Sequence, residues 1–210
     1  LLAELQNYGL VDYDERERCY RPGLGLVSLA GLTLTRFPGR ALARRALFEL
    51  RDETGESTHL SVLDHSDVVY LEQASTIHAR VDTDWVGLRQ PAFASTSGRL
   101  LLAYADPSGH GTGAGQPVSP AEPVDWPSAA ELAATREHGY LVRETPGGFG
   151  DEAMVGVAAA VCHPRSSLVY ALAVGGPARR VSTRRLHREL VPAVLRAASQ
   201  VSEHLGESPW

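Results

Sequence analysis

The sequence is poor in cysteine, contains no lysine and has no long apolar run, and these absences exclude several classes of protein. Its two cysteines, Cys19 and Cys162, are too few for a small secreted fold held by disulfides, and no signal-peptide pattern opens the sequence. The longest apolar stretches, residues 155–162 and 168–174, are far shorter than the roughly 20 residues of a membrane-spanning helix. We therefore expect a cytoplasmic protein with no membrane partner.

The charge of the chain limits how it can meet nucleic acid. All 20 basic residues are arginines, which together with the many alanines indicates a GC-rich genome rather than a mechanism. The formal net charge is -5, whereas neutralising phosphates needs a basic surface, so any contact with DNA must be local. The composition, 43% hydrophobic and 21% charged, is that of a globular protein with one or two cores.

The first part of the chain predicts a short helix, a hairpin and a second helix. Residues 1–8 have helical apolar spacing but no capping residue before them, so we expect this helix to continue from residues upstream. Gly9 ends the helix. Residues 10–13 and 18–21 predict two strands joined by a polar turn, and residues 24–36 predict an apolar helix.

The remainder of the chain predicts strands paired in hairpins, with helices before, between and after them. Helices are predicted at residues 40–54, 98–104, 128–137 and 184–205. Strands are predicted at residues 57–64, 68–73, 77–81, 139–142, 155–162 and 168–174, with Gly- and Pro-rich loops at 106–127 and 145–150. This order is typical of an α+β fold with a mainly antiparallel sheet.

The order of these parts resembles the IclR family of bacterial transcription regulators, which is named for a repressor. The motifs that carry the resemblance are Gly9-Leu10-Val11, Tyr20 to Leu26, Thr54 to Leu60, Leu88 to Pro91, Ser97 to Ala103, Gly139-Tyr140 and Gly175-Gly176-Pro177. Each motif is weak alone, but their order and spacing extend over nearly the whole chain. The resemblance implies a winged helix-turn-helix, a linker helix and a GAF-like effector-binding domain around a twisted antiparallel sheet. It also implies homodimers or homotetramers that bind palindromic operator DNA.

The resemblance divides the chain into three parts. Residues 1–23 correspond to the end of the recognition helix and the wing, residues 24–37 to the linker helix, and residues 38–210 to the effector-binding GAF-like domain. The residues that would enter the major groove lie upstream of Leu1, so most of the winged helix-turn-helix is expected to be missing here. In the wing, Arg16 and Arg18 are the candidates for DNA-binding contacts with phosphate, although a solvated hairpin tip is the favoured interpretation of each one taken singly.

The candidate ligand site combines a helix start with the later strands of the sheet. A helix N-terminus offers unpaired N–H groups and attracts carboxylates. By resemblance, one wall of the pocket is formed by this helix start and another by the last two strands. The candidate ligand-binding residues are Ser95, Thr96, Ser97, Gly98, Met154, Val155, Ala159, Ala173 and Gly175. Ordinary helix caps and ordinary core packing remain the alternative explanation for these residue types.

The chemistry of these positions predicts the class of effector. Ala159, Ala173 and Gly175 stand where members that bind small oxo-acids carry polar side chains. Small apolar residues imply a roomier, more apolar pocket, suited to an organic acid with an aromatic or otherwise larger body. The carboxylate would accept hydrogen bonds from the helix start. An empty pocket is the alternative.

An enzyme is the less favoured hypothesis, because no catalytic or metal-binding constellation has convincing spacing. Ser95 lacks the first glycine of a nucleophile elbow. His59, His65 and His78 are scattered, so each is interpreted as a solvated or turn histidine, and Cys162 as a small core residue. We therefore expect no catalytic residues, no metal and no cofactor.

A module that only oligomerises, without binding a ligand, is another alternative. The predicted linker helix has an apolar face but is too short to have a core of its own. A twin helix would cover this face in a homodimer. The face is made up of Leu26, Leu29, Ala30 and Leu34.

Overall fold

The computed structural model describes residues 1–76, 84–105, 125–149 and 152–207, with the side chains of all of these except 146–149. The chain divides into two compact units, residues 1–38 and 39–210. No helix in the described ranges is both long and apolar enough to cross a membrane. The predicted strand at 77–81, the residue His78 and most of the predicted loop at 106–127 lie outside the described residues.

The first unit consists of two helices and a hairpin. In chain order these elements are α1 (Leu2–Asn7), β1 (Val11–Asp14), β2 (Cys19–Pro22) and α2 (Gly25–Leu34). Gly9 follows α1 with a positive φ of 64°, which glycine adopts without the steric penalty of a side chain. The two strands pair antiparallel from Val11 opposite Pro22 to Asp14 opposite Cys19. None of the residues of α2 is buried within this unit.

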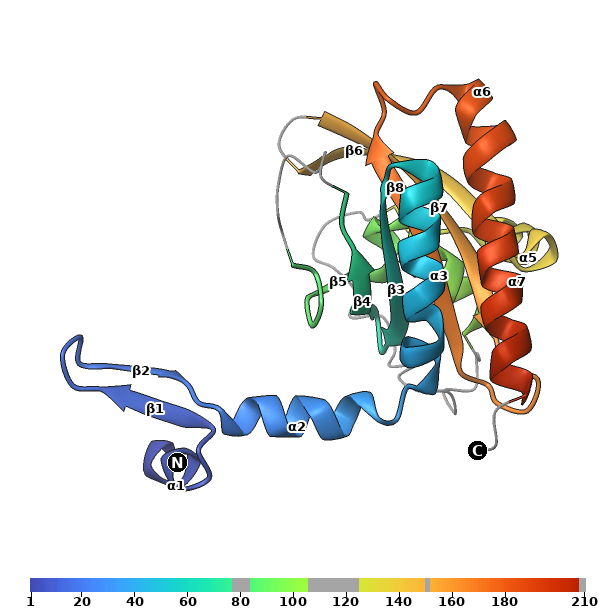
Figure 1. The fold of residues 1–210 in the computed structure, drawn as a ribbon. Coiled ribbons are helices and arrows are strands. Elements are labelled where there is room, and N and C mark those ends of the chain that lie inside the picture. Colours follow the sequence, from blue (N-terminus) through green and yellow to red (C-terminus); the bar gives the residue numbers. More distant parts are fainter. Residues whose placement is uncertain (77–83, 106–124, 150–151, 208–210) are drawn as a thin grey trace. The chain divides into compact units, whose positions relative to one another are not determined.

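The second unit is an antiparallel sheet with helices on both faces, so the α+β prediction is confirmed (Figure 1). Its six strands lie in the order β5-β4-β3-β8-β7-β6, and every neighbouring pair is antiparallel. The strands are β3 (Ser57–Asp64), β4 (Asp67–Ala74), β5 (Arg89–Pro91), β6 (Tyr140–Phe149), β7 (Glu152–Cys162) and β8 (Val169–Pro177). The helical segments are α3 (Pro38–Thr54), η1 (Ala92–Ala94), α4 (Thr96–Tyr104), α5 (Ala129–His138), α6 (Thr183–Arg185), η2 (Leu186–Leu190) and α7 (Val191–Glu207).

The two faces of the sheet are covered by different helices. Helices α3 and α7 cover one face, as Figure 1 shows, and the hydroxyl of Thr58 on β3 donates to the carbonyl of Leu47 on α3. Helix α4 covers the other face, where Leu100 and Leu101 pack with Ala171 of β8 in a buried cluster. Side chains alternate between the two faces along a strand, so neighbouring residues of one strand contact different helices.

A buried ion cluster ties the start of β3 to the end of β8. The Glu56 side chain is only 2% exposed and forms ion pairs with Arg180 and Arg185. Arg185 also donates to the carbonyl of Thr54, so it binds the end of α3 as well. A Cβ atom on Gly176 would lie 2.2 Å from Oε2 of Glu56, and this explains why glycine occupies that position.

The helix after the sheet contains an irregular segment. Ser182 caps α6, its hydroxyl accepting from the N–H of Arg185 at 3.2 Å. The next five residues, Leu186–Leu190, form a π turn, and α7 continues directly from it. α7 then buries an apolar face that includes Val194, Val201 and Leu205.

Two local predictions are wrong. Residues 145–149 were expected in a loop, but they are the end of β6, which pairs with β7 as far as Phe149 opposite Glu152 through an irregular register. Pairing with β7 resumes at Phe149, so the Pro and Gly residues between Thr145 and Phe149 produce an irregularity instead of ending the strand. Cys162 was expected in the core but is exposed, because it is the last residue of β7.

Candidate functional site

The start of α4 packs closely against η1 and against strand β7, with a glycine at each of the two contacts. The hydroxyl of Ser95 caps the helix and accepts from the N–H of Gly98 at 2.9 Å. A Cβ atom on Gly98 would lie 2.2 Å from the carbonyl oxygen of Ala92, and one on Gly156 would lie 2.7 Å from Oγ1 of Thr96. Glycine at both positions therefore lets the helix start lie directly on η1 and β7.

A cavity of about 170 Å³ lies beside this helix start. Its wall consists of the start of α4, the first part of β7, the second half of β8, and an aromatic side formed by His59, Tyr70 and Trp85. The lining residues are His59, Tyr70, Trp85, Gln90, Ala94, Ser95, Thr96, Ser97, Thr145, Met154, Val155, Gly156, Ala173, Val174 and Gly175. The N–H groups of Thr96 and Ser97, in the first turn of α4, have no partner within the helix, so they are the donors that this wall offers.

Three rings form the aromatic side of the cavity. The ring centroids of Tyr70 and Trp85 are 5.0 Å apart, and that of His59 lies 5.5 Å from Tyr70 and 6.2 Å from Trp85. Nε2 of His59 is buried and has no hydrogen-bond partner among the described residues. Burial lowers the pKa of His59 to about 4, so its ring is neutral at pH 7. Burial also raises the pKa of Tyr70 to about 12, and its hydroxyl accepts from the amide of Gln90.

Seven of the nine predicted ligand-site residues line this one cavity. These seven are Ser95, Thr96, Ser97, Met154, Val155, Ala173 and Gly175. Gly98 packs against Ala92 instead, as described above. Ala159 pairs with Leu172 and so lies on the face of the sheet that α3 and α7 cover, whereas Ala158 pairs with Ala173 on the cavity face. A placement shifted by one residue along β7 moves a side chain to the opposite face.

The sequence interpretation missed the aromatic side of the cavity and Gly156. His59 was interpreted as a solvated or turn histidine, which is wrong, because it lies within β3 and its Nε2 is buried. The alternation along 57–64 was the signal that could have placed it on the face opposite Leu60. Trp85 lies in the loop after the predicted strand at 77–81, where no periodic pattern places a side chain, so nothing in the sequence pointed to it. His65 is indeed a turn residue, exposed between β3 and β4.

Two arginines bind the backbone of the segment that leads into α4, next to the cavity. Arg99 donates through Nε to the carbonyl of Phe93 at 2.8 Å, and Arg143 donates to the carbonyls of Phe93 at 3.2 Å and Ala94 at 3.0 Å. Both guanidinium groups also contact the carboxylate of Asp125. The segment that leads into α4 is thus fixed by charge-assisted hydrogen bonds.

The other predicted positions do not form a reactive centre. Within the described ranges, no group of three or more His, Cys, Asp or Glu side chains could hold a metal ion. In the first unit, Arg16 and Arg18 are exposed at the hairpin turn, and the N–H of Arg16 donates to Oδ1 of Asp14 at 2.9 Å. Arg18 has a positive φ of 52°.

The antiparallel sheet, its helices and the cavity at the start of α4 define the effector-binding domain of a bacterial regulator. The family model "Bacterial transcriptional regulator IclR C-terminal" matches residues 32–203. The chain therefore belongs to the IclR family of bacterial transcription regulators.

Relatives and solved structures agree with this assignment. The HTH-type transcriptional regulator XynR of Escherichia coli is 31% identical over 149 residues, which are 68% of this chain and 58% of that protein. A putative IclR regulator from Silicibacter sp. superposes with a TM-score of 0.74 at 30% identity, covering 98% of this chain and 81% of that one. An IclR homolog from Microbacterium hydrocarbonoxydans, solved in complex with 4-hydroxybenzoate, has a TM-score of 0.69 at 23% identity. It covers 99% of this chain and 84% of its own, and it establishes the likeness of fold alone.

Proposed function

We propose that this chain is the effector-sensing part of a transcription regulator, and that its cavity takes an organic acid with a single aromatic ring. The regulator would bind operator DNA through its winged helix-turn-helix and change its affinity for the operator when the acid binds. The observation that carries the proposal is the cavity itself, which the start of α4 and the rings of Tyr70 and Trp85 line together.

The size and polarity of the cavity match this class of ligand. Its volume of about 170 Å³ is close to the ~150 Å³ of an engineered apolar cavity that binds benzene. The carboxylate would accept from the N–H groups of Thr96 and Ser97, where the helix dipole favours negative charge. The ring would lie between the aromatic side and the small residues Ala173 and Gly175. The Microbacterium homolog, whose ligand is a hydroxylated aromatic acid, is consistent with this class.

Titration of the chain with benzoate and 4-hydroxybenzoate tests the proposal, and the residues on the two faces of the sheet supply a matched pair of variants. Ala173→Leu should fill the cavity and weaken binding at least tenfold. Ala159→Leu adds the same atoms on the opposite face, so it should cost roughly 1–3 kcal/mol of stability and leave the affinity of the folded protein unchanged. Calorimetric titrations beside urea melts measure both effects. Equal affinity in the wild type and Ala173→Leu would show that the cavity is not the effector site.

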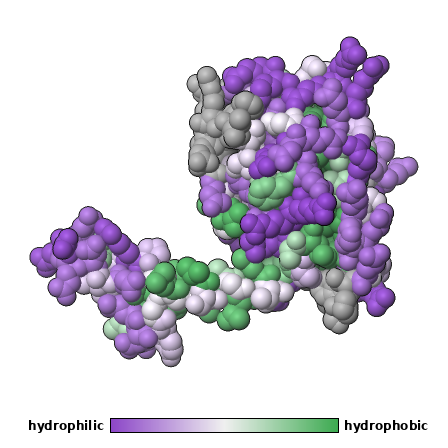
Figure 2. Space-filling view, viewed as in Figure 1, coloured by the Kyte–Doolittle hydropathy of each residue, from purple (hydrophilic) through white to green (hydrophobic). Residues whose placement is uncertain are grey.

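A second role, homodimerisation, is favoured by α2. This helix buries none of its residues, and its Val27 and Leu32 are 67% and 68% exposed. Figure 2 shows the hydrophobic surface along the helix. A helix that is apolar on all sides is stable in water only when another surface covers it, and a twin helix would do so. Light scattering at micromolar concentration should give twice the mass of the chain. Leu29→Glu should give a monomer, while the exposed β-hairpin variant Tyr13→Glu should remain dimeric.

An enzymatic role is the alternative that we disfavour. The relatives are transcriptional regulators, and the nucleophiles among the residues that line the cavity are the hydroxyls of Tyr70, Ser95, Thr96, Ser97 and Thr145. Ser95 is already engaged as the helix cap. We expect benzoate esters to be recovered unchanged after incubation with the chain.

A further inference from the structure

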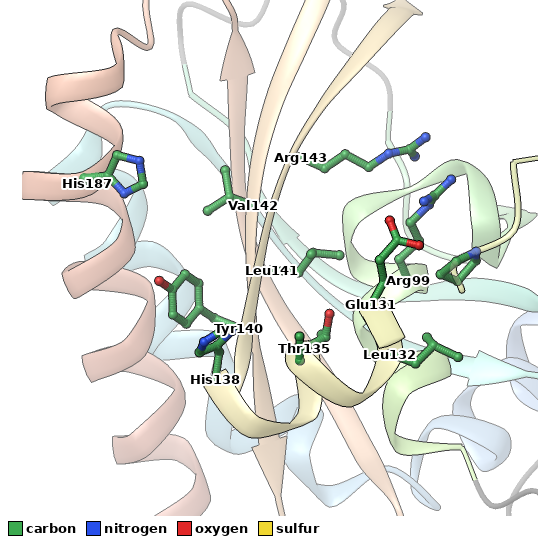
Figure 3. A pocket seen from close by; sticks show the side chains of 12 residues that line it. Arg99, Glu131, Leu132, Thr135, His138, Tyr140, Leu141, Val142, Arg143 and His187 are labelled. Atoms are coloured by element: carbon green, nitrogen blue, oxygen red, sulfur yellow. The ribbon is translucent and has the colours of Figure 1, made fainter. Parts of the chain in front are cut away.

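A second, larger cavity of about 440 Å³ lies between α5 and β6, and Arg99 and Arg143 are among its lining residues (Figure 3). It shares no lining residue with the cavity at the start of α4. Its lining residues are Arg99, Pro127, Glu131, Leu132, Ala134, Thr135, His138, Tyr140, Leu141, Val142, Arg143 and His187. The cavity therefore combines two guanidinium groups with an apolar wall.

The two arginines converge on one carboxylate that is itself at the surface. The Nη2 atoms of Arg99 and Arg143 both contact Oδ2 of Asp125. The side chains of Arg99 and Arg143 are 9% and 22% exposed, whereas that of Asp125 is 79% exposed. Burial, followed by repulsion from Arg99, lowers the pKa of Arg143. The buried members of the cluster are thus both cations, and their counterion is the member most accessible to water.

The other carboxylate near the arginines is held elsewhere. Glu131 lies at the rim of the cavity, where its Oε2 accepts from the N–H and the hydroxyl of Ser128, both at 2.7 Å. This capping box stabilises the start of α5. Within the described part of the chain, Glu131 forms no ion pair with Arg99 or Arg143. Asp125 is therefore the group that an incoming anion would replace.

The remaining wall suits an apolar body. Leu132 and Leu141 line the cavity and are only half-buried, so an occupant bound by the arginines would cover them. In Figure 3 the guanidinium groups of Arg99 and Arg143 lie at one end and Leu141 lies on the same side of β6 as Arg143, whereas Val142 is on the other side, toward His187. A ligand with a charged head and an apolar body would match this order. Guanidinium groups bind planar carboxylates through paired hydrogen bonds.

We propose that this second cavity is a distinct binding site for an organic carboxylate, which Arg99 and Arg143 bind in place of the Asp125 carboxylate while Leu141, on the same face of β6 as Arg143, covers its apolar body. The same guanidinium groups hold the carbonyls of Phe93 and Ala94, which lead into α4. Occupancy of the second cavity therefore acts on the wall of the first. The site does not depend on what the first cavity binds.

The tryptophans allow the two cavities to be observed separately. Trp85 lines the first cavity, whereas Trp126 follows Asp125 directly and its ring centroid lies 5.2 Å from that of Phe93. The third tryptophan is Trp210. A Trp85→Phe/Trp210→Phe protein keeps Trp126 as its single reporter for titration with benzoate. Equilibrium dialysis of labelled benzoate against the Ala173→Leu chain, in which the first cavity is filled, measures the remaining binding directly.

Substitutions of opposite expected sign test the site when they are made in the Ala173→Leu chain, in which the first cavity is filled. Asp125→Asn removes the competing carboxylate and should tighten benzoate binding at least threefold, whereas Arg143→Gln should weaken it at least tenfold. Arg143→Lys keeps the charge but loses the paired geometry, so its affinity for benzoate should lie between that of the chain with Arg143 and that of Arg143→Gln. Inorganic phosphate, which has no apolar body, should compete at least tenfold more weakly than benzoate.

Two results would overturn the second binding site. They differ from the result that would show the first cavity not to be the effector site. The first is no benzoate bound by Ala173→Leu in dialysis; the second is equal benzoate affinity in the Ala173→Leu chain with and without Asp125→Asn or Arg143→Gln. Asp125→Asn changes an exposed side chain, so it should fold even if Arg143→Gln does not. If instead all binding depends on Arg143 and none on Ala173, the second site stands and the proposed effector cavity fails.

Discussion

Two places in the second unit contain the same ions in opposite arrangements. In one, Glu56 lies between Arg180 and Arg185, and its side chain is 2% exposed while theirs are 29% and 25% exposed. In the other, Asp125 lies between Arg99 and Arg143, and its side chain is 79% exposed. The first cluster buries the anion and leaves the cations nearer to water, and the second does the reverse.

The difference separates a structural ion cluster from one that can exchange its counterion. A carboxylate that is almost fully buried can leave its arginines only if the surrounding structure opens, because its desolvation has already been offset by those hydrogen bonds. An exposed carboxylate leaves them with no such rearrangement, and water or another anion can take its place. The same two-to-one stoichiometry therefore stabilises the fold in one place and offers a binding site in the other.

The largest expected effect is at Glu56. Glu56→Gln keeps the shape of the side chain but removes the charge between Arg180 and Arg185, so it should lower the free energy of unfolding by about 3 kcal/mol. Urea denaturation at pH 7 measures this loss. A loss below about 1 kcal/mol would mean that burial of the anion does not distinguish the two clusters.

His59 extends the comparison to a buried polar group with no ion pair. Its pKa of about 4 lies below the ordinary value of 6.5, so between these values the unfolded chain takes up a proton that the folded protein does not. The linked stability is fully present above pH 6.5 and is lost as the pH falls toward 4. It should amount to roughly 2 kcal/mol between pH 7 and pH 5.

The variant His59→Phe should abolish that part of the pH dependence. Other groups titrate alike in both proteins, so the difference between their urea melts at pH 7 and pH 5 isolates His59. His204→Gln, an exposed change on α7, is the control and should follow the wild type. Parallel stability profiles for the wild type and His59→Phe would refute the pH prediction.

The smallest expected effect is at Asp125. Asp125→Asn should change the free energy of unfolding by less than about 1 kcal/mol, since exposed ion pairs contribute little. Its effect should instead be seen in benzoate binding, as described above. The comparison between the clusters would fail if this substitution cost as much stability as Glu56→Gln.

Much of the fold could be predicted from the sequence because its signals are local. The alternation of 57–64 gave β3 with its bounds, and the hydroxyls before Gly98 placed the start of α4. The end of β6 could not be predicted, because pairing with β7 resumes at Phe149 beyond the Pro and Gly residues, and local pattern does not reveal that partner strand.

The sequence predicted the part of the candidate site whose residue types are recognisable locally, which is the capped helix start and the small residues on the later strands. The helix start and Ala173 line the cavity as expected, but Ala159 does not, because a shift of one residue along β7 changes the face. The ion clusters escaped prediction altogether. Glu56 and Arg185 are 129 positions apart in the sequence, and only the folded chain brings them together.

The π turn at Leu186–Leu190 bears on how the sequences of relatives should be aligned. In a regular helix one extra residue rotates every later side chain by about 100° about the axis, which would turn the apolar face of α7 away from the sheet. A π turn contains that extra residue locally, so the following helix keeps its orientation. Chains that lack the extra residue should therefore align across this segment with a one-residue gap and resume the same buried positions, Val194, Val201 and Leu205, beyond it.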